Sequence, residues 1–406
     1  MRILHTSDWH LGKRLDDFSR LDEQREVLDE IIEIANVQDV DAVLIAGDLF
    51  DTYNPPTEAV DLFYRSLKRL TNNGTRPVIA IAGNHDSPDR IESPDPLARE
   101  CGIVFIGYPH SVVPVFELES GIKVLQSGEG FVELQLPRCA APLRILHTAY
   151  ANEFRMKTYL GSEDGEQQLR DMLATKWQNQ VANSCNSGGC NILVSHLFFI
   201  KEGEDLPEEP EDEKPILHVG GAQAIFSGNV PEGLQYVALG HLHRKQTVDS
   251  SPCPIVYSGS PLSYSFAEAN QNKFVMVVDL EPEKPAMVSE IMLTKGKRLL
   301  RYRADGLEKA IEWLKDNTHA LVELTLVSET YITAQERKQL LEVHPNIISI
   351  IPEVRSKELA AVGRSTADLS KKTEELFRDY FLKEKGQEPS DSLMSLFKEI
   401  LAEEEE

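Results

Sequence analysis

Cysteine is scarce in this chain of 406 residues, and none of the five cysteines has a partner at Cys-x-x-Cys spacing. An odd number of cysteines cannot pair completely within one chain, and the pattern does not resemble a disulfide framework. Free thiols are the form expected in a reducing cytoplasm. The cysteine usage therefore predicts a cytoplasmic protein whose fold does not depend on disulfide bonds.

Long hydrophobic runs are also absent, although hydrophobic residues make up 41% of the chain. No segment approaches the roughly 18–20 uninterrupted apolar residues that a membrane-spanning helix needs. A strand followed by polar motif residues is expected within the first eight positions, which leaves no room for a signal peptide. We therefore expect no membrane partner and a core large enough for two or three domains.

Basic residues are few, since 42 Lys and Arg stand against 66 Asp and Glu, for a net charge of −24. Such a charge at first argues against a nucleic-acid partner. The acidic residues are unevenly distributed, however, because residues 202–213 carry eight of them and no basic residue. Some of the remaining aspartates belong to a cluster whose charge two bound divalent cations would offset.

Polar side chains follow five apolar runs at the points where predicted strands end. Asp and His follow the run at 3–6, Asp follows the run at 42–46, and Asn and His follow the run at 78–82. His residues close the runs at 192–194 and 236–239. In open α/β sheets, ligands collect beyond the carboxyl ends of the strands. We expect these side chains to share one cleft: Asp8, His10, Asp48, Asn84, His196, His241 and His243.

The seven side chains offer three oxygen and four imidazole ligands, with no cysteine among them. This mixture suits Mn, Fe or Zn better than Ca or Mg, which prefer oxygen ligands. Seven ligands are too many for one ion but fit two ions that share a carboxylate. Two metal ions roughly 3.5–4 Å apart can activate a bridging water and stabilise a leaving oxygen during phosphoester hydrolysis.

The order of predicted elements favours an α/β fold with several parts. Strands and helices alternate through residues 1–82, which implies a parallel sheet. Strands dominate residues 103–147, and a helix is expected over about 165–181. We place a first domain at 1–280, a smaller β/α domain at 286–355 after a Pro-containing boundary at 281–285, a linker at 356–368, and a helical segment at 369–406.

Several of these motifs resemble the calcineurin-like metallophosphoesterases, and in particular the bacterial SbcD nucleases within that family: Asp8-Trp9-His10, Gly47-Asp48-Leu49-Phe50-Asp51, Gly83-Asn84-His85-Asp86, His196 and Gly240-His241-Leu242-His243. The resemblance implies a four-layer αββα sandwich with a smaller β/α capping domain and C-terminal helices. It implies two divalent metal ions, with Mn²⁺ expected.

The resemblance also implies a role for each matching residue. Asp8, His10 and His243 would hold one ion, whereas Asn84, His196 and His241 would hold the other, with Asp48 between them. His85 would steady the phosphate or protonate the leaving oxygen, because imidazole suits proton transfer near neutral pH. Asp86 would orient His85. Asp51 occupies a place where some relatives have His, so we expect only a supporting role for it.

At the level of function, the resemblance implies a DNA nuclease for repair and recombination. Its activities would be 3′→5′ exonuclease on double strands and endonuclease on single strands or hairpins. Its partners would be DNA ends and hairpins, an SbcC-like ATPase, and a second copy of the chain within a heterotetramer. Two alternatives remain open: another phosphoesterase of this fold that acts on nucleotides or phosphoproteins, and a non-catalytic scaffold that tethers DNA ends.

Two further groups of residues are candidates for binding. A basic run is either a phosphate-contacting surface for DNA or a solvated strand face: Lys295, Lys297, Arg298, Arg301 and Arg303. An apolar set at helical spacing near the C-terminus either docks into a groove of the ATPase or packs back on the smaller domain: Leu376, Phe377, Phe381, Leu396, Phe397 and Ile400.

Overall fold

The computed structural model describes residues 1–156, 165–203 and 224–355, with short stretches at 376–378, 381, 389, 393–394 and 397. The acidic run 202–213, the linker 356–368, Leu396 and Ile400 lie wholly or mostly outside the described residues. Contacts divide the chain into two units, Met1–Leu300 and Arg301–Glu406. Among the described residues, no helix is both long and apolar enough to cross a membrane.

The first unit contains a six-stranded sheet whose centre is parallel. Its strand order is β17 (Met287–Met292), β16 (Phe274–Asp279), β1 (Arg2–Thr6), β4 (Ala42–Ala46), β5 (Val78–Ile81) and β6 (Ile103–Ile106). Neighbouring strands in the series β1, β4, β5 and β6 pair in parallel, and β16 pairs antiparallel with β1. The central strands β4 and β5 are buried along their whole length, as their continuous apolar sequences predict for strands covered on both faces.

A second, seven-stranded sheet lies in the same unit. Its order is β14 (Gln246–Asp249), β15 (Ile255–Tyr257), β13 (Tyr236–Gly240), β10 (Cys190–His196), β9 (Leu143–Thr148), β8 (Phe131–Gln135) and β7 (Lys123–Gly128). Strands β9, β10, β13 and β15 pair in parallel. Two short strand pairs also lie in this unit: β2–β3 (Arg14–Leu15, Phe18–Ser19) and β11–β12 (Phe199–Ile200, Ile225–Phe226).

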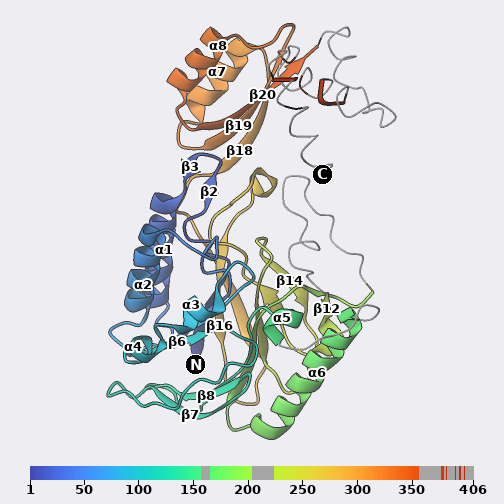
Figure 1. Cartoon of the computed structure of the whole chain (residues 1–406). Helices are drawn as coiled ribbons and strands as arrows, with labels where there is room; N and C mark the ends of the chain where they lie inside the picture. Colours follow the sequence, from blue (N-terminus) through green and yellow to red (C-terminus); the bar gives the residue numbers. More distant parts are fainter. Residues whose placement is uncertain are drawn as a thin grey trace. The chain divides into compact units, whose positions relative to one another are not determined.

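Three hydrophobic cores define the layers of the first unit. One core joins α1 (Leu21–Val37) and α2 (Thr57–Leu70) to the six-stranded sheet, and a second fills the space between the two sheets. The third packs α6 (Gly165–Ser184) on the seven-stranded sheet. Figure 1 shows α1 and α2 on one side of the sheets and α6 on the other. The predicted four-layer αββα sandwich is therefore confirmed.

Successive residues of the buried strands face different cores, which explains how one strand serves two layers. In β4, Val43 and Ile45 belong to the helix-facing core, whereas Leu44 and Ala46 belong to the core between the sheets. This alternation follows from the two-residue period of a strand. The polar residues that follow these strands lie beyond the carboxyl ends of the strands, outside the cores. Short helices α3 (Pro88–Glu92), α4 (Asp95–Arg99) and α5 (Glu153–Met156) lie in the connections.

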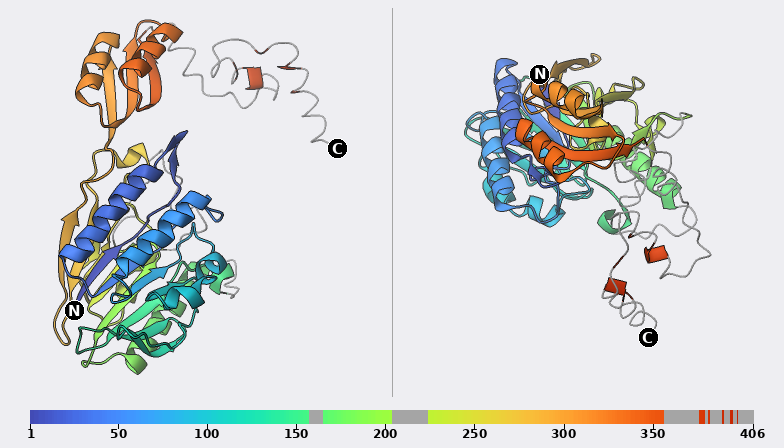
Figure 2. Two further views of the ribbon diagram at one scale, coloured as in Figure 1. Left: turned by 90° about the vertical axis from the view of Figure 1, so that its left-hand side faces the viewer. Right: turned by 90° about the horizontal axis from the view of Figure 1, so that it is seen from above.

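The second unit is a small β/α domain. Its three-stranded sheet has the order β18 (Leu299–Asp305), β19 (Leu321–Ser328) and β20 (Ile347–Val354). Along the chain, α7 (Leu307–Asp316) connects β18 to β19, and α8 (Ala334–Val343) connects β19 to β20. Figure 2 shows this unit from two further directions. Thr333 and Glu336 form a capping box at the start of α8, where each side chain bonds to the backbone N–H of the other.

The boundary between the units differs from the expected one at residues 281–285. Those residues form the turn of a hairpin, because β17 pairs antiparallel with β16 along six residues. β17 therefore extends the large sheet, and the first unit continues to Leu300. A Pro-containing turn and an interdomain linker have the same composition, so the sequence alone did not distinguish them.

Candidate metal centre

Both sheets of the first unit supply the seven candidate ligands. The six-stranded sheet contributes Asp8 and His10 after β1, Asp48 after β4, and Asn84 after β5. The seven-stranded sheet contributes His196, the last residue of β10, and both His241 and His243 after β13. The site therefore forms where the carboxyl ends of parallel strands from two sheets meet.

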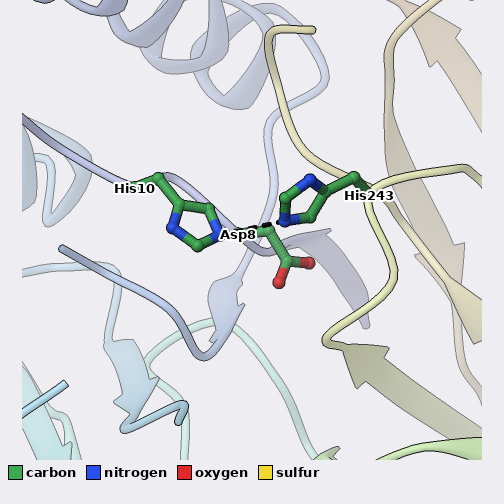
Figure 3. Close-up of side chains that lie close together, drawn as sticks. All are labelled: Asp8, His10 and His243. Atoms are coloured by element: carbon green, nitrogen blue, oxygen red, sulfur yellow. Dashed lines mark hydrogen bonds between the residues drawn. The ribbon is translucent and has the colours of Figure 1, made fainter. Parts of the chain in front are cut away.

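A first group consists of Asp8, His10 and His243, whose ligand atoms lie within 4.8 Å of one another. Figure 3 shows the two imidazoles and the carboxylate turned toward a common space. The Nε2 atoms of His10 and His243 are 3.0 Å apart. Asp8 accepts hydrogen bonds from the hydroxyl of Ser7 and from the backbone N–H of His241, which fix its carboxylate.

A second group consists of Asn84, His196 and His241. The amide oxygen of Asn84 lies 3.0 Å from Nε2 of His196 and 3.1 Å from Nδ1 of His241. Nδ1 of His196 lies 2.8 Å from the carbonyl oxygen of Ala46. Because a carbonyl oxygen can only accept, Nδ1 of His196 carries the proton and donates it there. A neutral His196 consequently presents a lone pair at Nε2.

Asp48 lies between the two groups. Its Oδ2 is 3.5 Å from Nε2 of His10 and 3.4 Å from Nε2 of His196. Its Oδ1 accepts the backbone N–H of His85 at 2.9 Å. One carboxylate thus faces an imidazole of each group, which is the position a shared ligand would require.

The donor set fits divalent cations. The lone pair of a neutral His196 faces the amide oxygen of Asn84, so these two acceptors repel each other unless a second proton or a cation lies between them. Around an ion with bonds of about 2.1 Å, neighbouring ligand atoms in octahedral geometry lie about 3.0 Å apart. The observed separations of 3.0–3.5 Å match this spacing. In addition, Nε2 of His241 is buried without a hydrogen-bond partner.

The backbone at four candidate ligands has positive φ: 53° at Asp8, 43° at His10, 48° at Asp48 and 112° at His241. Residues other than glycine rarely adopt this region, and such strain persists only where the surrounding structure imposes it. Backbone hydrogen bonds impose it here, since Asp8 N–H donates to Gly47 and His10 N–H donates to Asp48. The two strand-end segments thereby hold each other in conformations that aim their side chains into the site.

Glycines allow the ligand segments to approach closely. A Cβ at Gly83 would lie 2.1 Å from Oδ1 of Asp48, and one at Gly47 would lie 2.2 Å from Nδ1 of His196. A Cβ at Gly240 would lie 1.9 Å from the carbonyl oxygen of Ala46. Each glycine in the Gly-Asp, Gly-Asn-His and Gly-His-x-His motifs is therefore required by a neighbouring strand end rather than by its own turn alone.

The buried charges of the site perturb one another. Burial by itself lowers the pKa of His196, but the carboxylate of Asp48 outweighs burial and raises that pKa to about 9. Burial disfavours the ionised form of Asp48, yet His196 and His10 hold its pKa well below the usual range. Burial raises the pKa of Asp8 and lowers that of His241 to about 3. The carboxylates and imidazoles of the site therefore shift one another's pKa through burial and through their charges.

His85 lies beside these groups, and its ring is held by a different residue from the predicted Asp86. Nδ1 of His85 donates to the backbone carbonyl of Asp51 at 2.8 Å, which leaves Nε2 as the other reactive nitrogen. The carboxylate of Asp51 lies 3.5 Å from Nδ1 of His10 and 2.9 Å from Nζ of Lys13. Asp51 therefore orients His85 through its backbone carbonyl, while its carboxylate pairs with Lys13 and lies near His10.

Asp86 does not orient His85 in the described hydrogen bonds, contrary to the prediction. Its carboxylate accepts three backbone N–H groups, from Leu49 at 3.0 Å, Phe50 at 2.9 Å and Gly83 at 2.8 Å. These bonds tie the segment after β5 to the segment after β4. The sequence suggested a partner for His85 because the two residues are adjacent, whereas the chain turns Asp86 inward.

Two buried residues of the site were not found from the sequence. Arg155 in α5 donates to the carbonyl oxygens of Gly83 and Asp86 and thus encloses the Asn84-His85 segment. Glu268 lies 3.2 Å from Nδ1 of His243. Neither belongs to a strand-end motif. Glu268 stands out only as a charged residue between Ala267 and Ala269, and Arg155, with Glu153 and Lys157 nearby, gives no such signal.

The basic run is divided between the two units. Lys295, Lys297 and Arg298 line a cavity of about 300 Å³ in the first unit. Backbone N–H groups of Lys295 and Lys297 donate to Glu30 and Glu23 of α1, which anchors the loop, and Nζ of Lys297 lies 4.8 Å from the ring centroid of Phe18. In the second unit, Arg301 pairs with Glu323 and Arg303 with Glu353, so carboxylates offset these two charges.

Four of the six apolar C-terminal candidates fall on described residues: Leu376, Phe377, Phe381 and Phe397. The rings of Phe377 and Phe397 stack with centroids 3.9 Å apart, and those of Phe377 and Phe381 lie 6.0 Å apart. Phe377 therefore contacts both its neighbour Phe381 and the more distant Phe397 through aromatic rings.

The fold and the clustered Asp, Asn and His side chains define a two-metal phosphoesterase. The family model of the calcineurin-like phosphoesterases matches residues 1–245. The SbcD subunit of the nuclease SbcCD from Bacillus subtilis is 35% identical over 98% of this chain and 97% of its own length. The proteins of the same name from Rhodobacter capsulatus and Escherichia coli K12 are 33% and 28% identical, covering 75% and 98% of this chain and 72% and 97% of their own lengths. The chain belongs to the calcineurin-like phosphoesterase family and, within it, to the group of these SbcD proteins.

Proposed function

We propose that this chain is the nuclease subunit of an SbcCD-type complex, which hydrolyses phosphodiester bonds at DNA ends and hairpins together with an SbcC-like ATPase. The observation that carries the proposal is the convergence of seven oxygen and nitrogen ligands from two sheets beside the imidazole of His85. The full-length similarity to proteins named as parts of a nuclease supports DNA as the substrate.

In this proposal, Asp8, His10 and His243 hold one divalent ion, and Asn84, His196 and His241 hold the second. Asp48 serves both, because its Oδ2 faces an imidazole of each group. The mixed oxygen and imidazole set suits Mn, Fe or Zn, and from the family resemblance we assign Mn²⁺. When bound, the ions supply Lewis-acid chemistry to the phosphodiester.

His85 is the proposed general acid. Its Nδ1 is held by the carbonyl of Asp51, and its backbone N–H by Asp48, so Nε2 is the nitrogen that can give a proton to the leaving oxygen. The Asp86 carboxylate accepts the backbone N–H of Gly83, and Arg155 donates to the carbonyl oxygens of Gly83 and Asp86, so the residues on either side of Asn84-His85 are held in place. The chain thereby fixes the distance between the acid and the ligands, which is a requirement of positional catalysis.

DNA backbone contacts are assigned to the loop that carries Lys295, Lys297 and Arg298. These cations line a concave surface, and the loop bearing them is anchored through its backbone. The contribution of Arg301 and Arg303 is smaller, because Glu323 and Glu353 already pair with them. Phosphate contacts of this kind position DNA without reading its sequence.

The remaining features of the proposal follow the resemblance of the sequence motifs to this family. We assign 3′→5′ exonuclease activity on double strands and endonuclease activity on single strands and hairpins. We also assign a homodimer within a heterotetramer, a cytoplasmic location, and docking of the ATPase on the C-terminal set: Leu376, Phe377, Phe381, Leu396, Phe397 and Ile400.

The test is digestion of linear DNA labelled at either end, and of hairpin DNA, with Mn²⁺ or Mg²⁺, with and without the ATPase. The proposal expects metal-dependent cleavage that Asp48→Ala abolishes. A protein that hydrolyses phosphorylated peptides or nucleotides but leaves all DNA substrates intact would support the alternative phosphoesterase. A metal-binding protein that retains DNA ends without hydrolysing any phosphoester would support a tethering scaffold.

A further inference from the structure

We infer that a buried pair of charged residues, Glu268 and Lys273, positions the imidazole of His243. The inference rests on the proposed role of His243 as a metal ligand. Glu268 lies in a short 3₁₀ turn and is 2% exposed, while Lys273 immediately precedes β16 and is 8% exposed. Charged side chains are rarely buried to this degree unless they are paired, and these two pair with each other.

Glu268 determines which nitrogen of His243 carries the proton. Its Oε1 lies 3.2 Å from Nδ1 of His243 and also accepts the backbone N–H of Tyr264 at 3.0 Å. Because a carboxylate oxygen accepts, the ring proton resides on Nδ1 and the lone pair on Nε2. Nε2 is the atom that faces Nε2 of His10 at 3.0 Å, inside the first ligand group.

Lys273 keeps Glu268 in that role. Its ammonium group donates to the other carboxylate oxygen of Glu268, to the hydroxyl of Ser260 at 3.0 Å and to the carbonyl oxygen of His243 at 3.0 Å. An ammonium group has three N–H donors, and all three are used. The pair therefore holds His243 at two points, through its ring and through its own carbonyl group.

This arrangement differs from that of His196, whose Nδ1 donates to the backbone carbonyl of Ala46. No substitution can remove that backbone partner, but the partner of His243 is a side chain. A hydrogen-bonded partner behind a ligating imidazole fixes its tautomer and raises its basicity, and its loss commonly lowers metal affinity about 10–100-fold. Glu268 and Lys273 thus set the affinity of one of the two proposed sites.

The experiment titrates Mn²⁺ into the metal-free full chain and follows free Mn²⁺ by its EPR signal. The wild type should bind two ions. Glu268→Gln retains the volume of the side chain but leaves Lys273 without an anion, and it should weaken one ion about 10–100-fold while the other changes little. Glu268→Gln combined with Lys273→Met removes the unpaired charge, so the double variant should regain folding stability without regaining the weakened site.

Glu133→Gln is the matched control, because Glu133 forms a largely buried ion pair with Arg144 on the seven-stranded sheet, apart from the ligands. It should bind both ions as the wild type does. Wild-type affinity for both ions in the folded Glu268→Gln or double variant overturns the inference. Equal weakening of both ions in proportion to lost stability also overturns it, since a merely structural pair would give that result. A wild type that binds fewer than two ions would instead contradict the proposed metal set.

Discussion

Gly83→Ala is a one-atom test of the site geometry. Gly83 precedes Asn84, and its φ lies outside the positive region, so alanine adds no backbone strain there. The added Cβ would lie 2.1 Å from Oδ1 and 2.3 Å from the backbone N of Asp48. Since Cβ contacts below 3.0 Å essentially do not occur, the two strand-end segments must separate by about 0.9 Å or more.

The magnitude of the effect follows from that displacement. Misplacement of reacting groups by about 1 Å costs on the order of 10²-fold in rate, and overpacking a buried site costs about 1–3 kcal/mol of stability. We therefore expect Gly83→Ala to fold with a Tm lower by roughly 2–10 °C, to bind at least one metal ion more weakly, and to cleave DNA about 10²-fold more slowly.

The assay combines Mn²⁺ titration, thermal unfolding of the metal-free protein and the rate of digestion of end-labelled DNA. Gly128→Ala in β7 is the matched control, because its Cβ would meet nothing within 4 Å and its φ is also not positive. If Gly83→Ala binds two ions and cleaves DNA as fast as Gly128→Ala, the close approach of the two segments does not control the site, and the reasoning is refuted.

Four further predictions concern separate parts of the molecule. Asp48→Ala should lose both metal ions, because each group loses the carboxylate they share, and two ions retained in metal analysis would remove Asp48 from that role. His85→Ala should keep both ions and its DNA affinity but cleave about 10²–10⁴-fold more slowly, and a near-normal rate would make His85 structural. Neutralising Lys295, Lys297 and Arg298 should weaken DNA binding and flatten its dependence on salt more than neutralising the ion-paired Arg301 and Arg303, as binding titrations over a salt series would measure. Deleting residues 365–406 should leave the metals bound but abolish co-purification with the ATPase, and a truncated chain that still forms the complex at normal affinity would place the docking surface elsewhere.

The sequence predicted those features of the fold that depend on local pattern. Continuous apolar runs such as Val78–Ile81 predicted buried parallel strands, and the polar residues after them predicted where a site would form. The four-layer order came from the family resemblance, and the three cores bear it out.

Features that depend on distant contacts could not be predicted in this way. β17 belongs to the large sheet because of its pairing with β16, which composition does not encode. Asp86 binds the backbone of Leu49 and Phe50, 37 and 36 residues away, so adjacency to His85 was misleading. Glu268 and Arg155 reach the site only after the chain has folded, and each comes from a segment without a motif.

The candidate ligands come from two sheets that otherwise meet mainly through apolar side chains. Ions bound there would act as cross-links between the two halves of the sandwich. The folded state alone contains both halves of the site, so each ion present at 100 times its dissociation constant would stabilise it by about 2.7 kcal/mol. A chain in which only one sheet has formed offers at most four of the seven ligands. Metal loading would consequently mark the completion of folding, and a half-assembled chain would be unable to cut DNA.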